Sequence, residues 1–432
     1  MTGSAAQRLT LKEIVAMGVG GMIGGGIFSV LGLAVAQAGH AAPLAFALGG
    51  VVALVTGAAY ARLGVAFESD GGSFTYLEKA FAHPNVGGIA GWLLLAGYIG
   101  TLGLYAYTFG AYGSAMAGDA SATAPAMHHL LESLVLLAFL GINLYGVKAS
   151  GTAELLIVTV KVLILLLFSI IGLFFLRPER LLPVMDHGAL GTVMGAALIF
   201  VAFEGFELIP NAVNEMENPR RNLGRGIFWS IGVTIFVYVL VSLVAEGNLT
   251  PDQIAHDKEY ALAVAAEPFL GRAGYLLIGL AALFSTASAI NATLFGTARL
   301  GKVMAREREL PKVFAFSRKG GDIPWVSLTA ITLVTLALVN LADLSIIASF
   351  SSSTFLLIFL AIHVAAWRLR RRIVIHPAIP LIGMAATAFS WLALMAYLYQ
   401  QRPENLLWIG CGYGTVLVAE LGFSERRLFK RD

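Results

Sequence analysis

Twelve long apolar segments constrain the fold of this chain more than any other feature of its sequence. A helix of about 20 apolar residues crosses the hydrocarbon core of a bilayer. The chain is 58% hydrophobic and 13% charged, whereas a soluble domain is about 45–50% apolar and about 25% charged. The sequence therefore predicts an all-α integral membrane protein with 12 transmembrane helices, at approximately 13–38, 42–66, 86–117, 128–146, 151–176, 188–212, 223–246, 273–300, 325–342, 345–367, 379–400 and 404–423.

The connections between these segments predict a single domain over residues 1–432. No low-complexity linker divides the chain; an amphipathic stretch, 73–81, follows span two, and a polar insertion, 250–271, follows span seven. The first apolar segment is too long for a cleavable signal and lacks a small-residue cleavage site. Cys411 is the single cysteine, so an intrachain disulfide is excluded.

The distribution of lysine and arginine predicts the orientation, because cytoplasmic loops carry an excess of both. With the amino terminus inside, 23 of the 29 lysines and arginines fall on the inner side and one, Lys161, lies within a span. The outer side holds five: Arg177, Arg180, Lys258, Arg272 and Arg402. We therefore expect an even number of spans, with both termini in the cytoplasm and the chain in the inner (plasma) membrane.

The first span contains a glycine run, "GVGGMIGGGIF", over residues 18–28. Each glycine weakens a helix by about 1 kcal/mol relative to alanine. Glycines four apart, as at Gly20 and Gly24, also allow close helix packing, and for this span alone we favour packing. A second irregular span, span six, makes a functional break the better explanation of the glycine run.

Span six reads "IFVAFEGFELIPN" over residues 199–211, with Gly205 and Pro210 in its interior. Spans one and six are five apart, and transporters built from five-plus-five inverted repeats have corresponding helices broken near the membrane midplane. We therefore predict broken helices 1 and 6. The predicted repeats are 1–177 (spans one to five) and 178–372 (spans six to ten), followed by 373–432 with the last two spans and a tail.

Broken helices expose backbone groups that suit a zwitterion. A half-helix N-terminus attracts a carboxylate, and free carbonyls accept from an ammonium group. We expect the amides of Gly25, Gly26 and Ile27 to bind the carboxylate. The carbonyls expected to bind the ammonium group are those of Met22, Ile23, Phe200, Val201 and Phe203.

Lys161 lies about 16 Å along span five from its start, too deep for snorkelling to be a good explanation. An ionisable residue inside a membrane is a functional candidate. A lysine in an apolar site gives up its proton more readily than one in water. Lys161 therefore either carries a proton or acts as a fixed cation. Ser285, Thr286 and Ser288 in span eight offer hydroxyl partners, although such residues also simply bond helices together.

Glu204 and Glu207 lie on one face if span six is an intact helix. No metal-binding pattern accompanies them, so we expect no metal or other cofactor. Glu207 is expected to accept from freed backbone groups, while Glu204 is a candidate for substrate, gate or water contact. Phe200, Phe203 and Phe206 either line the cavity or are ordinary packing residues.

Two motifs together are similar to those of a known family. "GVGGMIGGGIFSVLG" resembles the first-helix motif of the amino acid–polyamine–organocation (APC) superfamily. "FVAFEGFELIPNAVNEMENPRRNLGRGI" resembles its sixth-helix signature, with the cytoplasmic loop that follows. The resemblance extends nearly to span eleven. "AELLIVTVKVLILLLF" and "LFSTASAINAT" resemble helices five and eight of the ApcT-type proton-coupled amino acid transporters.

The resemblance implies a LeuT-type inverted-repeat fold and alternating access. It implies that Lys161 replaces a sodium ion near the Gly20 carbonyl and Ser285, and that it loses and regains a proton. It also implies that the substrate carboxylate meets Gly25, Gly26 and Ile27. Glu204 departs from the uncharged residue expected there, and an acid at this position favours cationic amino acids or amines.

These observations predict a proton-coupled amino acid symporter whose partners are an amino acid, protons and the bilayer, with no nucleic acid. The alternative within the class is an amino acid exchanger or a polyamine or cationic amino acid carrier. A channel would need a continuous polar stripe, and a membrane enzyme would need a nucleophile and base or metal ligands; neither is evident in the sequence.

Overall fold

The computed structural model describes residues 8–69, 71–81, 84–117, 124–145, 151–257, 259–307, 309–317 and 323–423. Within these ranges the chain forms helices and their connections, apart from an isolated parallel bridge between Leu9 and Met216. The prediction of an all-helical membrane protein is confirmed. Some cations counted for the orientation lie outside the described residues: Lys148, Lys258, Arg308, Arg318, Lys319 and those of 424–432.

The predicted apolar segments coincide with helices. The α-helices are α1 Leu11–Ala38, α2 Ala42–Phe67, α3 Gly72–Ala80, α4 Pro84–Met116, α5 Ala124–Tyr145, α6 Gly151–Phe175, α7 Gly188–Leu198, α8 Pro219–Asn248, α9 Pro251–His256, α10 Ala261–Arg306, α11 Trp325–Leu341, α12 Leu344–Arg368, α13 Arg370–Ile373, α14 Ala378–Gln401 and α15 Pro403–Phe423. Short 3₁₀ helices are η1 Gly39–Ala41, η2 Pro178–Leu181, η3 Phe200–Phe203, η4 Phe206–Glu215 and η5 Lys312–Ala315.

By length and hydropathy alone, eight of the described helices could cross a membrane, or nine if a bent pair counts as one span. That count takes α1 and α2 together as one stretch of 57 residues. A helix of that length would measure about 85 Å, well over twice the thickness of a bilayer core. Two crossings therefore fit this stretch better than one. The total of 12 spans and the repeat pattern remain predictions.

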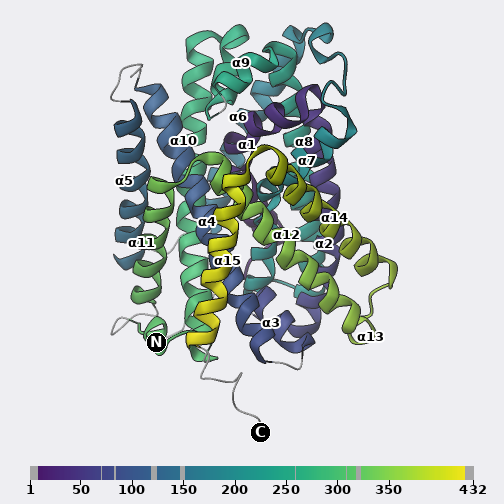
Figure 1. Cartoon of the computed structure of the whole chain (residues 1–432), viewed down its shortest axis with the longest axis vertical. Coiled ribbons are helices and arrows are strands. Elements are labelled where there is room, and N and C mark those ends of the chain that lie inside the picture. The colour runs from purple at the N-terminus through teal and green to yellow at the C-terminus, as the bar shows by residue number, and fades with distance from the viewer. Residues whose placement is uncertain are drawn as a thin grey trace.

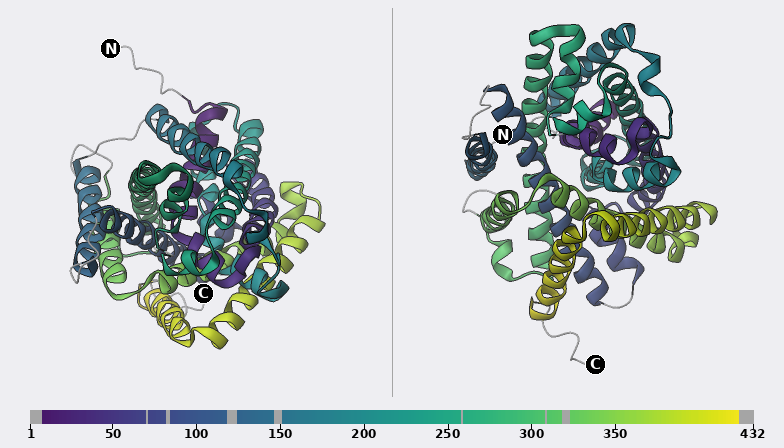
Figure 2. Two further views of the ribbon diagram at one scale, coloured as in Figure 1. Left: turned by 90° about the horizontal axis from the view of Figure 1, so that it is seen from above. Right: turned by 45° about the horizontal axis from the view of Figure 1, so that its top comes forward.

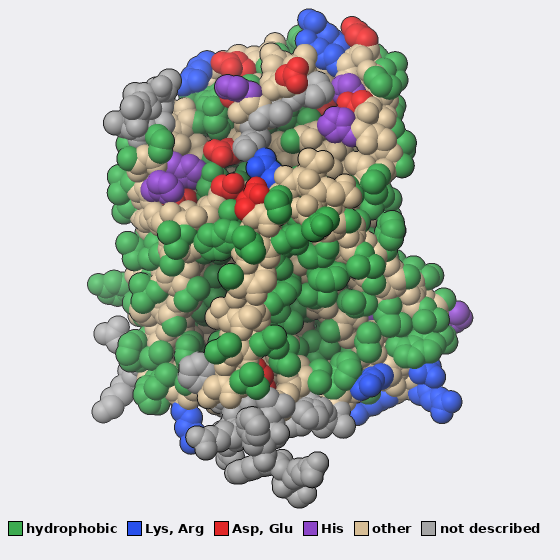
Figure 3. Space-filling view, viewed as in Figure 1, with side chains coloured by type: hydrophobic (Ala, Val, Ile, Leu, Met, Phe, Trp, Pro, Cys, Tyr) green, Lys and Arg blue, Asp and Glu red, His purple; other side chains and the backbone are tan. Residues whose placement is uncertain are grey.

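The long helices run roughly side by side, with α9 at one end of the bundle and α3 and α13 at the other (Figure 1). The two ends of the bundle differ in charge: Figure 3 shows a mostly hydrophobic middle, acidic side chains and histidines with some Lys and Arg towards the top, and Lys and Arg at the lower edge. Helices α14 and α15 lie on the periphery in both views of Figure 2. Helix α1 is apolar and buried along most of its length, as expected for a helix surrounded by others.

The predicted break in span one is wrong for this structure, because α1 is helical from Leu11 to Ala38 without interruption. Close packing explains how the glycine run is tolerated. A Cβ added at Gly21 would lie 3.0 Å from the Cα of Gly205, and one added at Gly26 would lie 2.9 Å from the carbonyl oxygen of Ala202. The glycines therefore let neighbouring segments approach α1, and these tertiary contacts override the low helix propensity.

The predicted break in span six is confirmed. Helix α7 ends at Leu198, and the segment formed by η3 and η4 continues at an angle of 53° to it. Gly205 joins η3 to η4 with φ 128° and ψ −29°, a conformation that residues with a Cβ rarely adopt. The break therefore sits where the sequence placed glycine, five residues before Pro210.

A second irregularity lies in the insertion after span seven. Gly271 (φ 61°, ψ −160°) separates two helical parts of α10. The shorter part and α9 lie within the polar insertion expected at 250–271. The insertion therefore forms short helices rather than an open loop, and the longer part of α10 contains span eight.

Candidate functional site

Four successive carbonyls in the glycine run of α1 each accept a hydrogen bond from a side chain of a different helix. For Gly20, Gly21, Met22 and Ile23 in turn, the donors are Lys161 Nζ of α6 at 3.1 Å, the Tyr105 hydroxyl of α4 at 3.1 Å, the Tyr238 hydroxyl of α8 at 2.5 Å and the Ser285 hydroxyl of α10 at 2.7 Å. A carbonyl oxygen has two lone pairs, so it can accept such a bond beside a helical one. Side chains of four helices thus converge on one turn of α1.

Lys161 is the charged member of this set. It is 3% exposed and lies near the middle of α6. Its ammonium group bonds the Gly20 carbonyl directly, which places a cation at the start of the four-carbonyl turn. Ser285, which the resemblance placed near this lysine, instead donates to Ile23.

Glu154 was not singled out from the sequence. It lies two helical turns before Lys161 on α6, interacts with it electrostatically, and accepts a hydrogen bond of 3.3 Å from the Ser288 hydroxyl. Residues seven apart share a helix face. The spacing of Glu154 and Lys161 in the sequence could therefore have indicated that the two charges lie on the same face of α6. The structure thus joins Gly20, Lys161, Glu154 and Ser288 across α1, α6 and α10.

The break in span six holds two buried carboxylates, each 1% exposed. Glu204 Oε2 accepts a 2.6 Å bond from the Thr101 hydroxyl of α4. Glu207 Oε2 accepts a 2.7 Å bond from the Gly205 amide, so it binds a backbone group left free by the break. Tyr98 donates to Glu207 Oε1 at 3.4 Å. The two acids therefore anchor the break to α4.

Hydroxyls from two other helices also bind the broken segment. Ser352 of α12 accepts from the Val201 amide at 3.0 Å and donates to the Leu198 carbonyl at 2.6 Å. Tyr238 donates to the Ala202 carbonyl at 2.9 Å as well as to α1. Tyr238 consequently links the glycine run to the break, and neither partner was evident from the sequence.

The residues expected to bind substrate lie close together but are tightly packed. The Gly25 carbonyl accepts from Ser29 of its own helix at 2.6 Å, and a Cβ on Gly25 would collide with the Tyr105 ring. The rings of Phe200 and Phe206 lie 5.7 and 5.4 Å from that of Phe359. In this arrangement the two phenylalanines are packing residues, and the Gly25 amide lies inside a continuous helix.

The comparison with known families shows to which class of protein this chain belongs. The family model described as amino acid permease matches residues 9–408. The chain belongs to the amino acid permease family. An uncharacterized protein of Methanocaldococcus jannaschii is 36% identical over 390 residues, covering 88% of each chain. The inner membrane transport protein YbaT of Escherichia coli is 32% identical over 415 residues, covering 93% of each chain.

A solved structure supports the fold. The crystal structure of the Eremococcus coleocola manganese transporter, in complex with an aromatic bis-isothiourea substituted compound, aligns with a TM-score of 0.62. The match covers 96% of this chain and 94% of that one at 12% identity, so it speaks for the fold alone. The permease is thus a multi-span membrane transporter of the APC class and not an enzyme.

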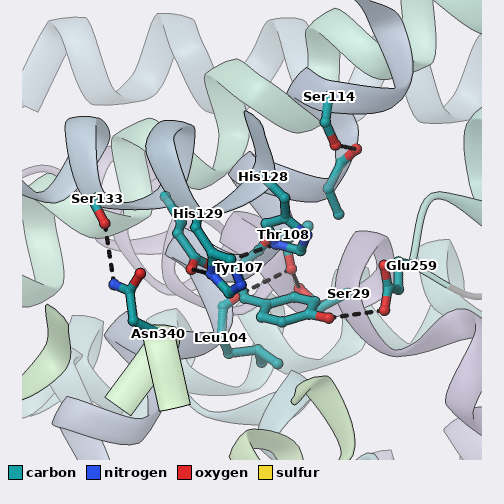
Figure 4. A network of polar contacts seen from close by, with 12 residues as sticks. Ser29, Leu104, Tyr107, Thr108, Ser114, His128, His129, Ser133, Glu259 and Asn340 are labelled. Carbon is teal, nitrogen blue, oxygen red and sulfur yellow. Dashed lines mark hydrogen bonds and ion pairs between the residues drawn. The ribbon is translucent and has the colours of Figure 1, made fainter. Parts of the chain in front are cut away.

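The permease also has a polar network near the C-terminal end of α4 (Figure 4). The Tyr107 hydroxyl donates to Glu259, just before α10, at 2.8 Å, and the Tyr107 carbonyl lies 3.1 Å from His128 Nε2 of α5. His129 Nδ1 lies 2.7 Å from the buried Glu132. Within the described ranges, no three His, Cys, Asp or Glu residues are arranged to hold a metal ion. The network joins α4, α5 and the segment before α10.

Proposed function

We propose that this permease imports amino acids by proton symport through alternating access, with both termini in the cytoplasm. The observation that carries the proposal is the hydrogen bond from Lys161 to the Gly20 carbonyl. An ammonium group donates a stronger hydrogen bond than a neutral amine. The proton on Lys161 therefore determines how firmly α6 holds α1, and a group whose protonation differs between two conformations couples proton binding to their equilibrium.

The proposed substrate site is the region between the glycine run and the break at 199–205. The amides of Gly25, Gly26 and Ile27 bind the carboxylate after α1 unwinds locally. The low helix propensity of the run supports this step. The side-chain hydroxyls that bond the carbonyls of the run also support it, because they can replace helical hydrogen bonds that are lost on unwinding. The proposed ammonium ligands are the carbonyls of Met22, Ile23, Phe200, Val201 and Phe203.

A second candidate is a carrier or exchanger of cationic amino acids or polyamines. The specific observation that favours it is Glu204, a buried carboxylate in the break that accepts a hydrogen bond from the neutral Thr101 hydroxyl. A substrate cation would complement this charge, since buried charges are normally paired.

The test is uptake of a radiolabelled amino acid panel into proteoliposomes under an imposed proton or sodium gradient. Symport predicts accumulation with the proton gradient alone, and no accumulation with sodium alone. Lys161→Met should abolish accumulation, whereas the exposed Lys79→Met should not. Full accumulation by Lys161→Met would refute the coupling role. Uptake that requires internal amino acid and no gradient would favour the exchanger.

A further inference from the structure

Three arginines from three helices surround a cavity of about 730 Å³ at the end of the bundle that also holds α3 and α13. They are Arg62 near the end of α2, Arg220 in the first turn of α8 and Arg372 of α13. Val65, Phe228 and Val374 contribute apolar walls. The cavity thus combines a concentration of positive charge with an apolar lining.

Within the part of the chain that the structure describes, no acidic side chain is paired with the arginines of this cavity. Among the residues that the structure describes, no carboxylate lies within ion-pair distance of Arg62, Arg220 or Arg372. The Arg372 guanidinium lies 4.8 Å from the centre of the Phe67 ring, a contact that orients the cation without reducing its charge. Arg220 also lies at the positive end of the α8 dipole. All of these features attract an anion.

The apolar walls and the position of the cavity indicate where that anion comes from. Phe228 is 45% exposed and Val374 is 75% exposed, so both present apolar surface beside the arginines. Figure 3 shows Lys and Arg side chains grouped at the lower edge, directly below the hydrophobic band. The positive-inside pattern assigns this end to the cytoplasm. A basic pocket between helices at this level is placed to meet lipid head groups.

We propose that this cavity binds the phosphodiester head group of an anionic phospholipid of the cytoplasmic leaflet, with the acyl chains along Phe228 and Val374. Guanidinium groups recognise phosphate oxygens through two parallel hydrogen bonds. A soluble phosphate would use the arginines but would leave the apolar walls without a partner. A bound head group would bridge α2, α8 and α13, and so stabilise their contact.

The test uses purified full-length protein and native mass spectrometry with phosphatidylglycerol or phosphatidylcholine. The variant Arg62→Gln/Arg220→Gln/Arg372→Gln removes the three cavity charges. Its matched control, Arg221→Gln/Arg225→Gln/Arg371→Gln, removes three exposed charges of α8 and α13 that lie outside the cavity lining. Ala66→Trp fills the cavity while keeping every arginine, so it tests the site even if the triple variant is unstable.

We expect phosphatidylglycerol to bind at least about tenfold more weakly to the cavity triple variant and to Ala66→Trp, and nearly normally to the control. Phosphatidylglycerol should also raise the thermal unfolding midpoint of the wild type more than phosphatidylcholine does. Equal losses in both triple variants would overturn the proposal, since they would show non-specific attraction. Equal binding of phosphatidylcholine, or full displacement of lipid by millimolar inorganic phosphate, would overturn it too.

Discussion

Gly21 of α1 and Gly205 of the span-six break pack backbone against backbone. A Cβ on Gly21 would lie 3.0 Å from the Cα of Gly205, and a Cβ on Gly205 would lie 2.7 Å from the Gly21 carbonyl carbon. The glycine run of α1 and the span-six break therefore meet, at Gly21 and Gly205, at a point where neither tolerates a side chain. Any movement of α1 against the break changes this contact first.

Gly205→Ala should destabilise the protein by at least about 2 kcal/mol, because it adds steric overlap to a strained positive φ. Gly232→Ala is the matched control, since the space around Gly232 on α8 is empty; it should be neutral or stabilising by up to about 1 kcal/mol. Thermal unfolding in detergent measures both. Similar midpoints for the two variants would show that the Gly21–Gly205 contact is loose.

Glu154→Gln should reduce proton-driven uptake by about tenfold, because it removes the carboxylate that interacts with Lys161 and accepts from Ser288. Ser288→Ala should have a smaller effect. The double variant should fall little further than Glu154→Gln alone, since the hydrogen bond from Ser288 acts through the carboxylate charge that Glu154→Gln already removes. Initial uptake rates in proteoliposomes give all three values.

The control for this set is Ser114→Ala, which removes a serine hydroxyl that donates to the Ala111 carbonyl of its own helix. It should leave uptake unchanged. Strictly additive losses from Glu154→Gln and Ser288→Ala would separate the two residues and contradict their shared role.

Glu204→Gln should lower arginine uptake by about tenfold or more and alanine uptake by less than about threefold. The glutamine oxygen can still accept from Thr101, so the change isolates the charge. Thr101→Val, which removes the 2.6 Å hydrogen bond and keeps the charge, should affect both substrates alike. The ratio of the two uptake rates is the readout, and an unchanged ratio in Glu204→Gln would exclude Glu204 from substrate selection.

Tyr107→Phe should loosen the segment before α10, because it removes the hydrogen bond to Glu259, a loss of about 1 kcal/mol or more. Hydrogen–deuterium exchange should become faster by roughly fivefold for the backbone around Glu259. The exposed Tyr399→Phe on α14 is the control and should leave exchange there as it is. If both variants exchange alike, the polar network around Tyr107 does not hold this segment.

The sequence by itself determined the class of fold and the position of one break. In a bilayer the backbone must bond to itself, so long apolar segments have to be helices. Gly205 and Pro210 in an apolar segment then predict an irregular span, because glycine allows the positive φ and proline removes a donor. The hydrogen bond between the Glu207 carboxylate and the freed amide of Gly205, two residues before it, is likewise a local consequence of the break.

Only the tertiary structure decided what the glycine run does. The irregular span six and the five-span spacing predicted a break in α1, but the run is helical because Tyr238, Ser285 and other side chains of four helices bond its carbonyls and pack where Cβ atoms would lie. The grouping of Arg62, Arg220 and Arg372 likewise depends on how α2, α8 and α13 come together. Local sequence sets the preferences of a segment, whereas contacts between distant segments decide which preference prevails.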